Sequence, residues 1–215
     1  MRPHLAPALA LAGLLLAPRS AAAHIEITSH IPRHGKETQK TAPCGAADDG
    51  GPGGNIYVYE PGATVTFAWH EFIDHPGHYR VAFDDAGSDA FVDPATAAER
   101  YSNDAVLVDG IADVDGVHDY EVDVTLPAIE CAACTVQILQ IMTDKAPYGD
   151  GNDIYYHCVD VQLVAGGGEH MLTGEEAGCG CAQAPGRGGA GALLAALVLG
   201  LAWRRGPRRR GLTST

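Results

Sequence analysis

Hydrophobic and polar side chains alternate in short runs along the middle of this 215-residue chain. The runs with strict alternation are residues 64–72, 79–83 and 119–126. A period of two is typical of a strand with one buried face, and Ile25 and Ile27 begin the same pattern early in the chain. Residues 135–142 and 154–164 are nearly continuous in apolar side chains, as expected of strands buried between two sheets.

Turn-forming residues separate these runs. Glycine, proline, aspartate and asparagine cluster in residues 48–55, 84–88, 109–116 and 145–153. A single short helix is expected at residues 94–98, with Pro94 in its first turn. Six or so short strands with turns between them predict an all-β domain, an immunoglobulin/fibronectin-like antiparallel β-sandwich with long loops.

The beginning of the chain does not belong to this domain. Arg2 and His4 precede an apolar run at residues 5–17, and three alanines ending at Ala23 follow it. A basic start, a short apolar run and small residues at the end are typical of a secretory signal. We therefore expect residues 1–23 to be cleaved after Ala23 and the protein to be exported.

The far end has three successive parts. A glycine-rich linker at residues 166–189 contains Cys179 and Cys181, and residues 190–215 combine an apolar run with a cluster of arginines. The fourteen residues of that run span only about 21 Å as a helix, against roughly 30 Å of hydrocarbon. The end resembles the sorting tails called MYXO-CTERM, in which the two cysteines are the processing and anchoring region. A single-span tail anchor is the alternative. Both interpretations of the C-terminal end place the domain at the cell envelope or outer surface, and release of the domain after processing is a further outcome.

Residues 24–165 remain as the working domain, and their charge limits the partners. They contain six Lys and Arg against twenty-four Asp and Glu, a net charge of −18. Nucleic acid is excluded as a partner because the phosphate backbone needs a basic surface. No Gly-x-Ser-x-Gly, phosphate-binding loop or His-Glu-x-x-His is present, so hydrolase and nucleotide-binding functions have no support.

Four cysteines fall within the domain, at positions 44, 131, 134 and 158. An even count in an exported domain predicts two disulfides. Of the three possible pairings, we favour Cys44–Cys158 with Cys131–Cys134, because the second is local and the first ties the N-terminal region to a late strand. A Cys-x-x-Cys zinc or redox site is the competing interpretation of residues 131–134.

Cleavage after Ala23 would leave His24 as the first residue. Its free α-amine and imidazole can then hold one metal ion together, and a second histidine would complete three nitrogen donors, a set that suits Cu(II). The strand at residues 64–72 ends just before His75, which we expect at its tip in a turn with Pro76 and Gly77. His70 and His78 are the competing choices for the second ligand.

Residues 24–164 resemble the lytic polysaccharide monooxygenases, especially the chitin-binding type. The resemblance is carried by His24 directly after the signal, Pro32-Arg33, Pro43-Cys44-Gly45, Trp69 six residues before His75, and residues 134–137 and 155–161. It implies one copper ion on His24 and His75, with Tyr155 at the axial position as part of the catalytic site. It also implies oxidative cleavage of chitin, cellulose or a similar polysaccharide by a monomer.

Two other functions remain open. The same pair of histidines could bind copper for uptake, storage or delivery, with a copper donor or acceptor as the partner. A purely adhesive sandwich, in which His24 is coincidental, is the third possibility. The residues that orient the ligands are expected among Glu71, Asp74 and Gln137, which the sequence does not rank.

Overall fold

The computed structural model describes residues 24–145 and 147–173, and within them the chain forms nine strands and no helix. The strands are β1 (Ile25–Ile27), β2 (Asn55–Tyr59), β3 (Thr64–Glu71), β4 (Gly77–Asp84), β5 (Val106–Ala112), β6 (Asp119–Thr125), β7 (Cys131–Met142), β8 (Ile154–Leu163) and β9 (His170–Thr173). One sheet has the order β1-β3-β6, and the other has the order β5-β4-β7-β8-β2-β9. This confirms the predicted β-sandwich.

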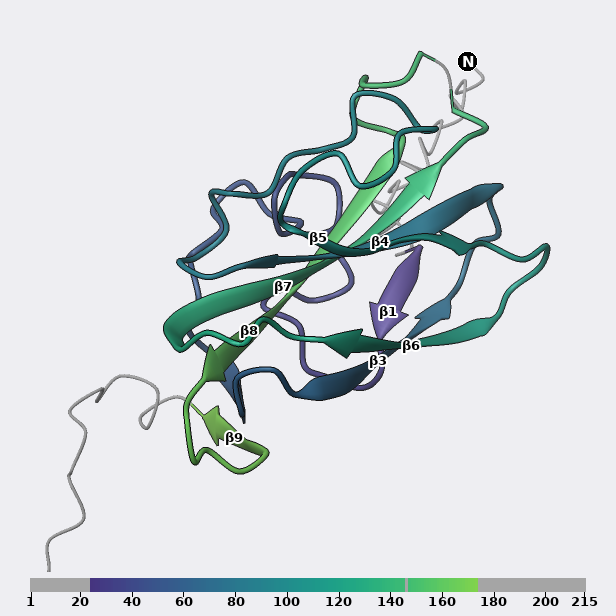
Figure 1. Ribbon diagram of the computed structural model, residues 1–215. Helices are drawn as coiled ribbons and strands as arrows, with labels where there is room; N and C mark the ends of the chain where they lie inside the picture. The colour runs from purple at the N-terminus through teal and green to yellow at the C-terminus, as the bar shows by residue number, and fades with distance from the viewer. Residues whose placement is uncertain (1–23, 146, 174–215) are drawn as a thin grey trace, which may run out of the picture. The chain divides into compact units, whose positions relative to one another are not determined.

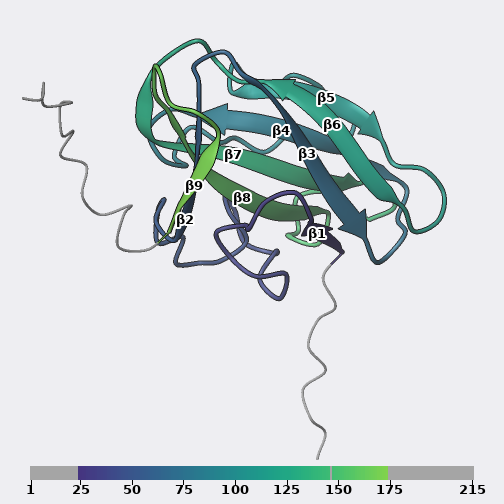
Figure 2. The ribbon, with the colours of Figure 1, turned by 90° about the horizontal axis from the view of Figure 1, so that it is seen from below.

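The main core lies between the two sheets. The strands β3 and β6 lie as one layer against β4, β7 and β8 (Figures 1 and 2). Phe67 and Trp69 of β3 meet Val81 of β4, Ile138 of β7 and Val159 of β8, and all five are fully buried. The alternating side chains of β3 therefore form the inner face that the sequence pattern predicts.

One strand pairing departs from the predicted antiparallel arrangement. β2 pairs with β8 in parallel, with Ile56 opposite Asp160, whereas every other pairing described among the nine strands is antiparallel. β2 reaches the sheet only after a long loop at residues 28–54, so hairpin geometry does not set its direction. The six-stranded sheet is consequently mixed.

Two strands occupy segments that the sequence analysis placed in turns or linkers. β5 overlaps the predicted turn at 109–116, because Gly110 lies at φ +69° and the strand continues through an irregular register with β4. β9 lies inside the predicted linker at 166–189 and pairs with β2. The folded domain therefore extends past residue 165.

The predicted helix at residues 94–98 is wrong. The segment forms a single turn in which the Glu99 amide donates to the Thr96 carbonyl at 3.0 Å. The Pro94 carbonyl accepts a hydrogen bond from the Tyr148 hydroxyl at 2.8 Å, and the Ala95 amide donates to the Glu99 carboxylate. The Tyr148 hydroxyl thus takes the Pro94 carbonyl, which would accept the first hydrogen bond of a helix at this position.

β7 and β8 are buried on both faces, as predicted. One face packs against the three-stranded sheet, but the other face is covered by loops and not by a sheet as the sequence predicted. A second core cluster contains Leu139, Ile141 and Tyr156, with Tyr148 and Ala97 from the loops packed against it. Because these side chains need a cover, the long loops of the domain fold back over this face.

Both predicted disulfides are confirmed. Cys44 is bonded to Cys158 and Cys131 to Cys134. The first bond fixes the 28–54 loop on β8, where Arg33 also donates to the Asp160 carboxylate at 2.6 Å. Disulfides are typical of exported proteins.

Several predictions fall outside the described residues. These are the signal at 1–23 with Ala23, the sorting motif with Cys179 and Cys181, and the apolar tail at 190–215. Among residues 24–145 and 147–173, no helix that could cross a membrane is found.

Candidate metal centre

Strand register brings His24 and His75 to the same end of the sandwich. β1 pairs with β3 so that Ile25 lies opposite Glu71, and the Phe72 amide donates to the His24 carbonyl at 2.8 Å. His24 therefore lies beside the end of β3, and His75 follows in the turn that leads into β4. Two residues 51 positions apart meet because one antiparallel pair and one turn converge there.

The turn holds His75 through a close backbone approach at Gly77. A Cβ atom added to Gly77 would lie 2.5 Å from the Ile141 carbonyl oxygen, closer than real side chains allow. Gly77 pairs with Met142, so the same register continued past the strand ends places His75 opposite Asp144. The sequence analysis did not name Asp144, because this pairing depends on a register that only the folded sheet defines.

The two imidazole rings face each other. Nε2 of His75 lies 3.1 Å from Nε2 of His24, and the ring planes are 14° apart with centroids 5.0 Å apart. Tyr155 from the start of β8 stacks on the His24 ring at a centroid distance of 3.7 Å. The structure thus brings together all three residues that the sequence analysis placed in the catalytic site.

Asp144 orients the His75 ring. Its Oδ2 atom lies 3.1 Å from Nδ1 of His75, and an ionised carboxylate can only accept, so Nδ1 donates. Although its partial burial opposes the effect, the hydrogen bond with His75 and the charge of Lys145 lower the pKa of Asp144. The Nδ1 proton on this side leaves the lone pair of Nε2 directed at His24, which is the arrangement of a metal-ligating histidine.

The main chain of His24 is held by Gln39, which is a second residue that the sequence analysis missed. The His24 amide donates to Oε1 of Gln39 at 3.2 Å, and Nε2 of Gln39 donates to the Ile25 carbonyl at 2.5 Å. Nε2 of Gln39 also lies 2.7 Å from Nε2 of His157, whose pKa is lowered to about 4 by burial. A neutral, buried His157 and a buried Gln39 thus clamp the start of β1.

A charged hollow of about 460 Å³ opens beside the two histidines. His24 and Tyr155 line it together with Lys40, Asp144, Lys145, Asp150 and Asn152. The Lys40 ammonium lies 3.5 Å from the centroid of the Tyr155 ring, so it occupies the face opposite the stacked His24 ring. Burial is the main reason why the pKa of Lys40 is lowered to about 8.

The competing ligand candidates lie elsewhere. Nδ1 of His70 bonds to Asp119 at 2.7 Å on the outer face of β3. His78 is buried in β4 with its Nε2 atom 3.6 Å from Asp109. Of the three histidines considered as the partner of His24, the structure places His75 beside it.

Two of the residues predicted to orient the metal ligands, Gln137 and Glu71, bond to other groups. Gln137 donates to the Pro43 carbonyl at 2.8 Å. Glu71 is fully buried and accepts from Gln140 at 3.0 Å, and burial together with the charge of Asp113 raises the pKa of Glu71 to about 7. The carboxylate that lies against the His75 ring is that of Asp144, which is not among Glu71, Asp74 and Gln137.

With His24 joined to Ala23, the donor set fits a nitrogen-bound ion only in part. Because the chain is continuous through residue 23, the main-chain nitrogen of His24 is an amide and has no lone pair for a metal. The described residues contain no group of three or more His, Cys, Asp or Glu that could hold an ion. A site at His24 and His75 therefore depends on a main-chain nitrogen as its third donor.

No protein-family model matches the chain, and no curated protein matches it. Among solved structures, the chain is similar to an AA10 lytic polysaccharide monooxygenase from Streptomyces lividans, with 15% identity and a TM-score of 0.32. The match covers 50% of this chain and 59% of the other, less than two thirds of that enzyme's length. The fold class rests on the sheets described above.

Proposed function

We propose that the mature protein holds one copper ion on His24 and His75 and uses it for the oxidative cleavage of a polysaccharide. The observation that supports this proposal is the convergence of the two imidazole rings, whose Nε2 atoms lie 3.1 Å apart, with Asp144 behind His75. Once the His24 ring turns to direct Nδ1 at the site, one nitrogen of each ring could approach the same metal ion at about 2.0–2.1 Å. A set of three nitrogen donors suits Cu(II) better than other common divalent ions.

The third nitrogen comes from export processing. Cleavage after Ala23 would turn the main-chain nitrogen of His24 from an amide into an amine, which has a lone pair to donate. Gln39 already accepts a hydrogen bond from this nitrogen and would hold the amine in position. A chelate with the amine uses Nδ1 of the same side chain, so we expect the His24 ring to turn when the amine is freed.

Copper bound at this site would supply the one-electron chemistry that oxygen or peroxide needs to oxidise a C–H bond of the glycan. The other residues hold and orient. Asp144 keeps the Nδ1 proton of His75 in place, and Tyr155 excludes water from one face of the His24 ring. Lys40, Asp150 and Asn152 line the hollow and offer hydrogen-bonding groups to sugar hydroxyls.

A second candidate function is copper uptake, storage or delivery without oxidation. The observation that favours it is the lining of the hollow, in which Lys40, Lys145, Asp144 and Asp150 carry charge and Tyr155 is the aromatic member apart from His24. A charged hollow suits the transfer of an ion, whereas a crystalline glycan is bound better by exposed aromatic rings.

Copper titration tests the shared part of both candidates. The chain that begins at His24 should bind one copper ion, and a matched chain with one glycine added before His24 should bind at least about 100-fold more weakly. The added residue turns the amine back into an amide and leaves every side chain unchanged. Equal affinity for the two chains would overturn the proposed site.

Incubation with an insoluble glycan separates the enzyme from the copper carrier. The copper-loaded chain beginning at His24, a reductant and chitin, cellulose or xylan should release oxidised oligosaccharides, detected by mass spectrometry. The glycine-extended chain is the control for free copper in solution. Tight copper binding without oxidised products would leave the copper-handling function in place.

A further inference from the structure

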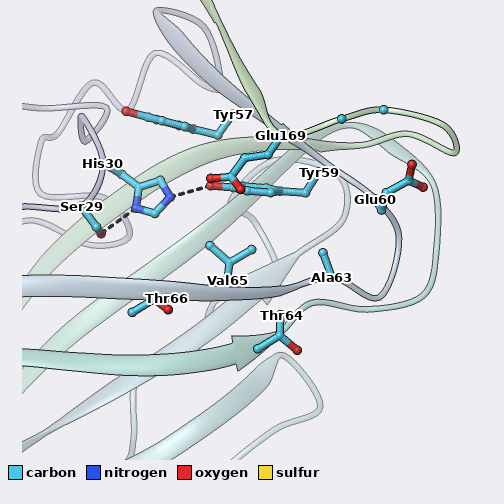
Figure 3. A pocket seen from close by; sticks show the side chains of 12 residues that line it. Ser29, His30, Tyr57, Tyr59, Glu60, Ala63, Thr64, Val65, Thr66 and Glu169 are labelled. Carbon is cyan, nitrogen blue, oxygen red and sulfur yellow. Dashed lines mark hydrogen bonds between the residues drawn. The ribbon is translucent and has the colours of Figure 1, made fainter.

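A second hollow lies at the other end of β3, away from His24 and His75. It has a volume of about 450 Å³ and opens between β2 and β3 under the turn at residues 166–169 (Figure 3). Thr66 on its wall is five residues from Glu71 at the end of β3, which corresponds to roughly 17 Å along a strand. The hollow is therefore separate from the candidate metal centre.

A buried histidine forms the inner wall of this hollow. Nδ1 of His30 lies 2.6 Å from the Ser29 hydroxyl, and Nε2 lies 2.7 Å from the Tyr59 hydroxyl. Only 8% of His30 is exposed, and this burial lowers its pKa to about 4. The ring is consequently neutral at pH 7 and held in one orientation by two hydrogen bonds.

Aromatic rings gather at this wall. Tyr57 and Tyr59 are two residues apart on β2, so they project from the same face about 7 Å apart. The Tyr57 ring meets the His30 ring edge-on at a centroid distance of 4.6 Å, and its hydroxyl accepts from the Ile31 amide at 2.8 Å. Three rings with fixed positions thus border a space whose opposite side is the small, apolar Ala63 and Val65 (Figure 3).

The charged side chains that line the hollow are both carboxylates. Glu60 and Glu169 lie at its mouth, and no Lys or Arg is among its described lining residues. Glu60 accepts a hydrogen bond from the Gly166 amide at 3.1 Å. Glu169 lies beside the phenol end of Tyr59, and burial together with its charge raises the pKa of that tyrosine (Figure 3).

We propose that this hollow binds a small organic cation with an ammonium group, of the size of a quaternary ammonium ion. Such a cation is attracted to the faces of aromatic rings and to nearby carboxylates, and its methyl groups pack on apolar side chains. His30 is 8% exposed and its ring stacks on Phe67 at a centroid distance of 4.6 Å, so it supports the Tyr57 ring from behind without adding a positive charge. A neutral ligand of the same shape would gain no attraction from the carboxylate of Glu169.

Amide chemical shifts in NMR, followed during titration of the purified protein, test this assignment. The probe is choline, and its neutral isostere 3,3-dimethylbutan-1-ol is the matched ligand, since the two differ in charge and hardly in shape. Choline should shift the amides of Ile31, Tyr57 and Glu169 in a saturable way. The alcohol should bind at least about fivefold more weakly, in line with a cation–π contribution.

Two variants localise the site. Glu169→Gln and Tyr57→Leu should each weaken choline binding about fivefold or more. Glu121→Gln is the matched control, because it removes the same charge from an exposed position on β6. An unchanged NMR spectrum outside the hollow would show that each variant is folded.

Three results would overturn the proposal. Equal binding of choline and the alcohol would make the hollow an apolar site only. Choline shifts that are spread over the acidic surface, with Glu121→Gln as damaging as Glu169→Gln, would indicate unspecific attraction. Saturable binding of methyl glucoside in the same hollow, without binding of choline, would assign it to sugars.

Discussion

The two ends of β3 each contain a histidine against a tyrosine, yet the two sites have opposite chemistry. At one end, His75 has its Nδ1 atom on the Asp144 carboxylate, and its Nε2 atom faces another imidazole at 3.1 Å. At the other end, both ring nitrogens of His30 are bonded to hydroxyl groups. In the proposed assignment, the partner of the second ring nitrogen therefore separates the histidine that would bind a metal from the histidine that is a part of the wall.

Surroundings reinforce this difference. The hollow beside His24 mixes Lys40 and Lys145 with aspartates. The hollow beside His30 has carboxylates as its charged lining residues, and His30, Tyr57 and Tyr59 are its aromatic lining residues. The first arrangement suits an ion held by nitrogen donors, whereas the second suits a ligand that itself carries positive charge.

The largest expected effect is the loss of copper binding when the His75 imidazole is removed. His75→Ala, in the chain that begins at His24, should weaken copper binding about 100-fold or more, because one of three nitrogen donors is gone. His30→Gln is the control at the other end and should leave copper affinity unchanged. Calorimetric titration measures the copper affinity of both variants. A larger loss of copper affinity from His30→Gln than from His75→Ala would contradict the proposed site at His75.

Removal of the Tyr59 hydroxyl should affect stability at the other end. Tyr59→Phe leaves Nε2 of the buried His30 without its partner, so we expect the free energy of unfolding to fall by about 1–3 kcal/mol. Urea denaturation measures the change. Tyr101→Phe is the control because Tyr101 is exposed, and equal stability of the two variants would show that the hydrogen bond to His30 is unimportant.

Loss of the Asp144 charge should act on the metal without removing a ligand. Asp144→Asn should weaken copper binding about tenfold, since a carboxylate behind a metal-bound histidine orients the ring and raises its basicity. Asp150→Asn removes the same charge from the same hollow, but Asp150 bonds to the Asn152 amide instead of a histidine. If the two variants weaken copper binding equally, Asp144 acts through its negative charge alone and not through its hydrogen bond with His75.

The smallest expected effect is a pH dependence that His30 contributes. Burial lowers its pKa from 6.5 to about 4, so the unfolded chain takes up the proton first as pH falls, and stability is lost between about pH 6.5 and 4. From pH 6.5 to 5.5, the original protein should lose about 1 kcal/mol more than His30→Gln. Urea denaturation at both pH values measures the loss of stability in each protein. The contributions of His78 and His157 are the same in both proteins, so they cancel when the two losses are compared. Parallel losses would mean that His30 is not buried in its neutral form.

Local patterns predicted a large part of the fold. Alternation at residues 64–72 and 119–126 corresponds to β3 and β6, and the apolar runs correspond to β7 and β8. The period of two is a property of neighbouring residues, so it is visible without the partner strand. β5 was missed because Asp109-Gly110 is typical of a turn, whereas Arg80 bonds to Asp109 at 2.9 Å and the strand continues.

The sequence by itself singled out His24 and His75 for the proposed metal centre, because His24 follows a predicted processing motif and His75 follows a strand within a turn. Only the tertiary structure decided that Asp144 and Gln39 support them, since strand register and loop packing join residues far apart in the chain. The second hollow is likewise a product of packing. Its walls come from the loop segment with Ser29 and His30, from β2 and β3, and from the turn at 166–169, so no single segment of the sequence shows it.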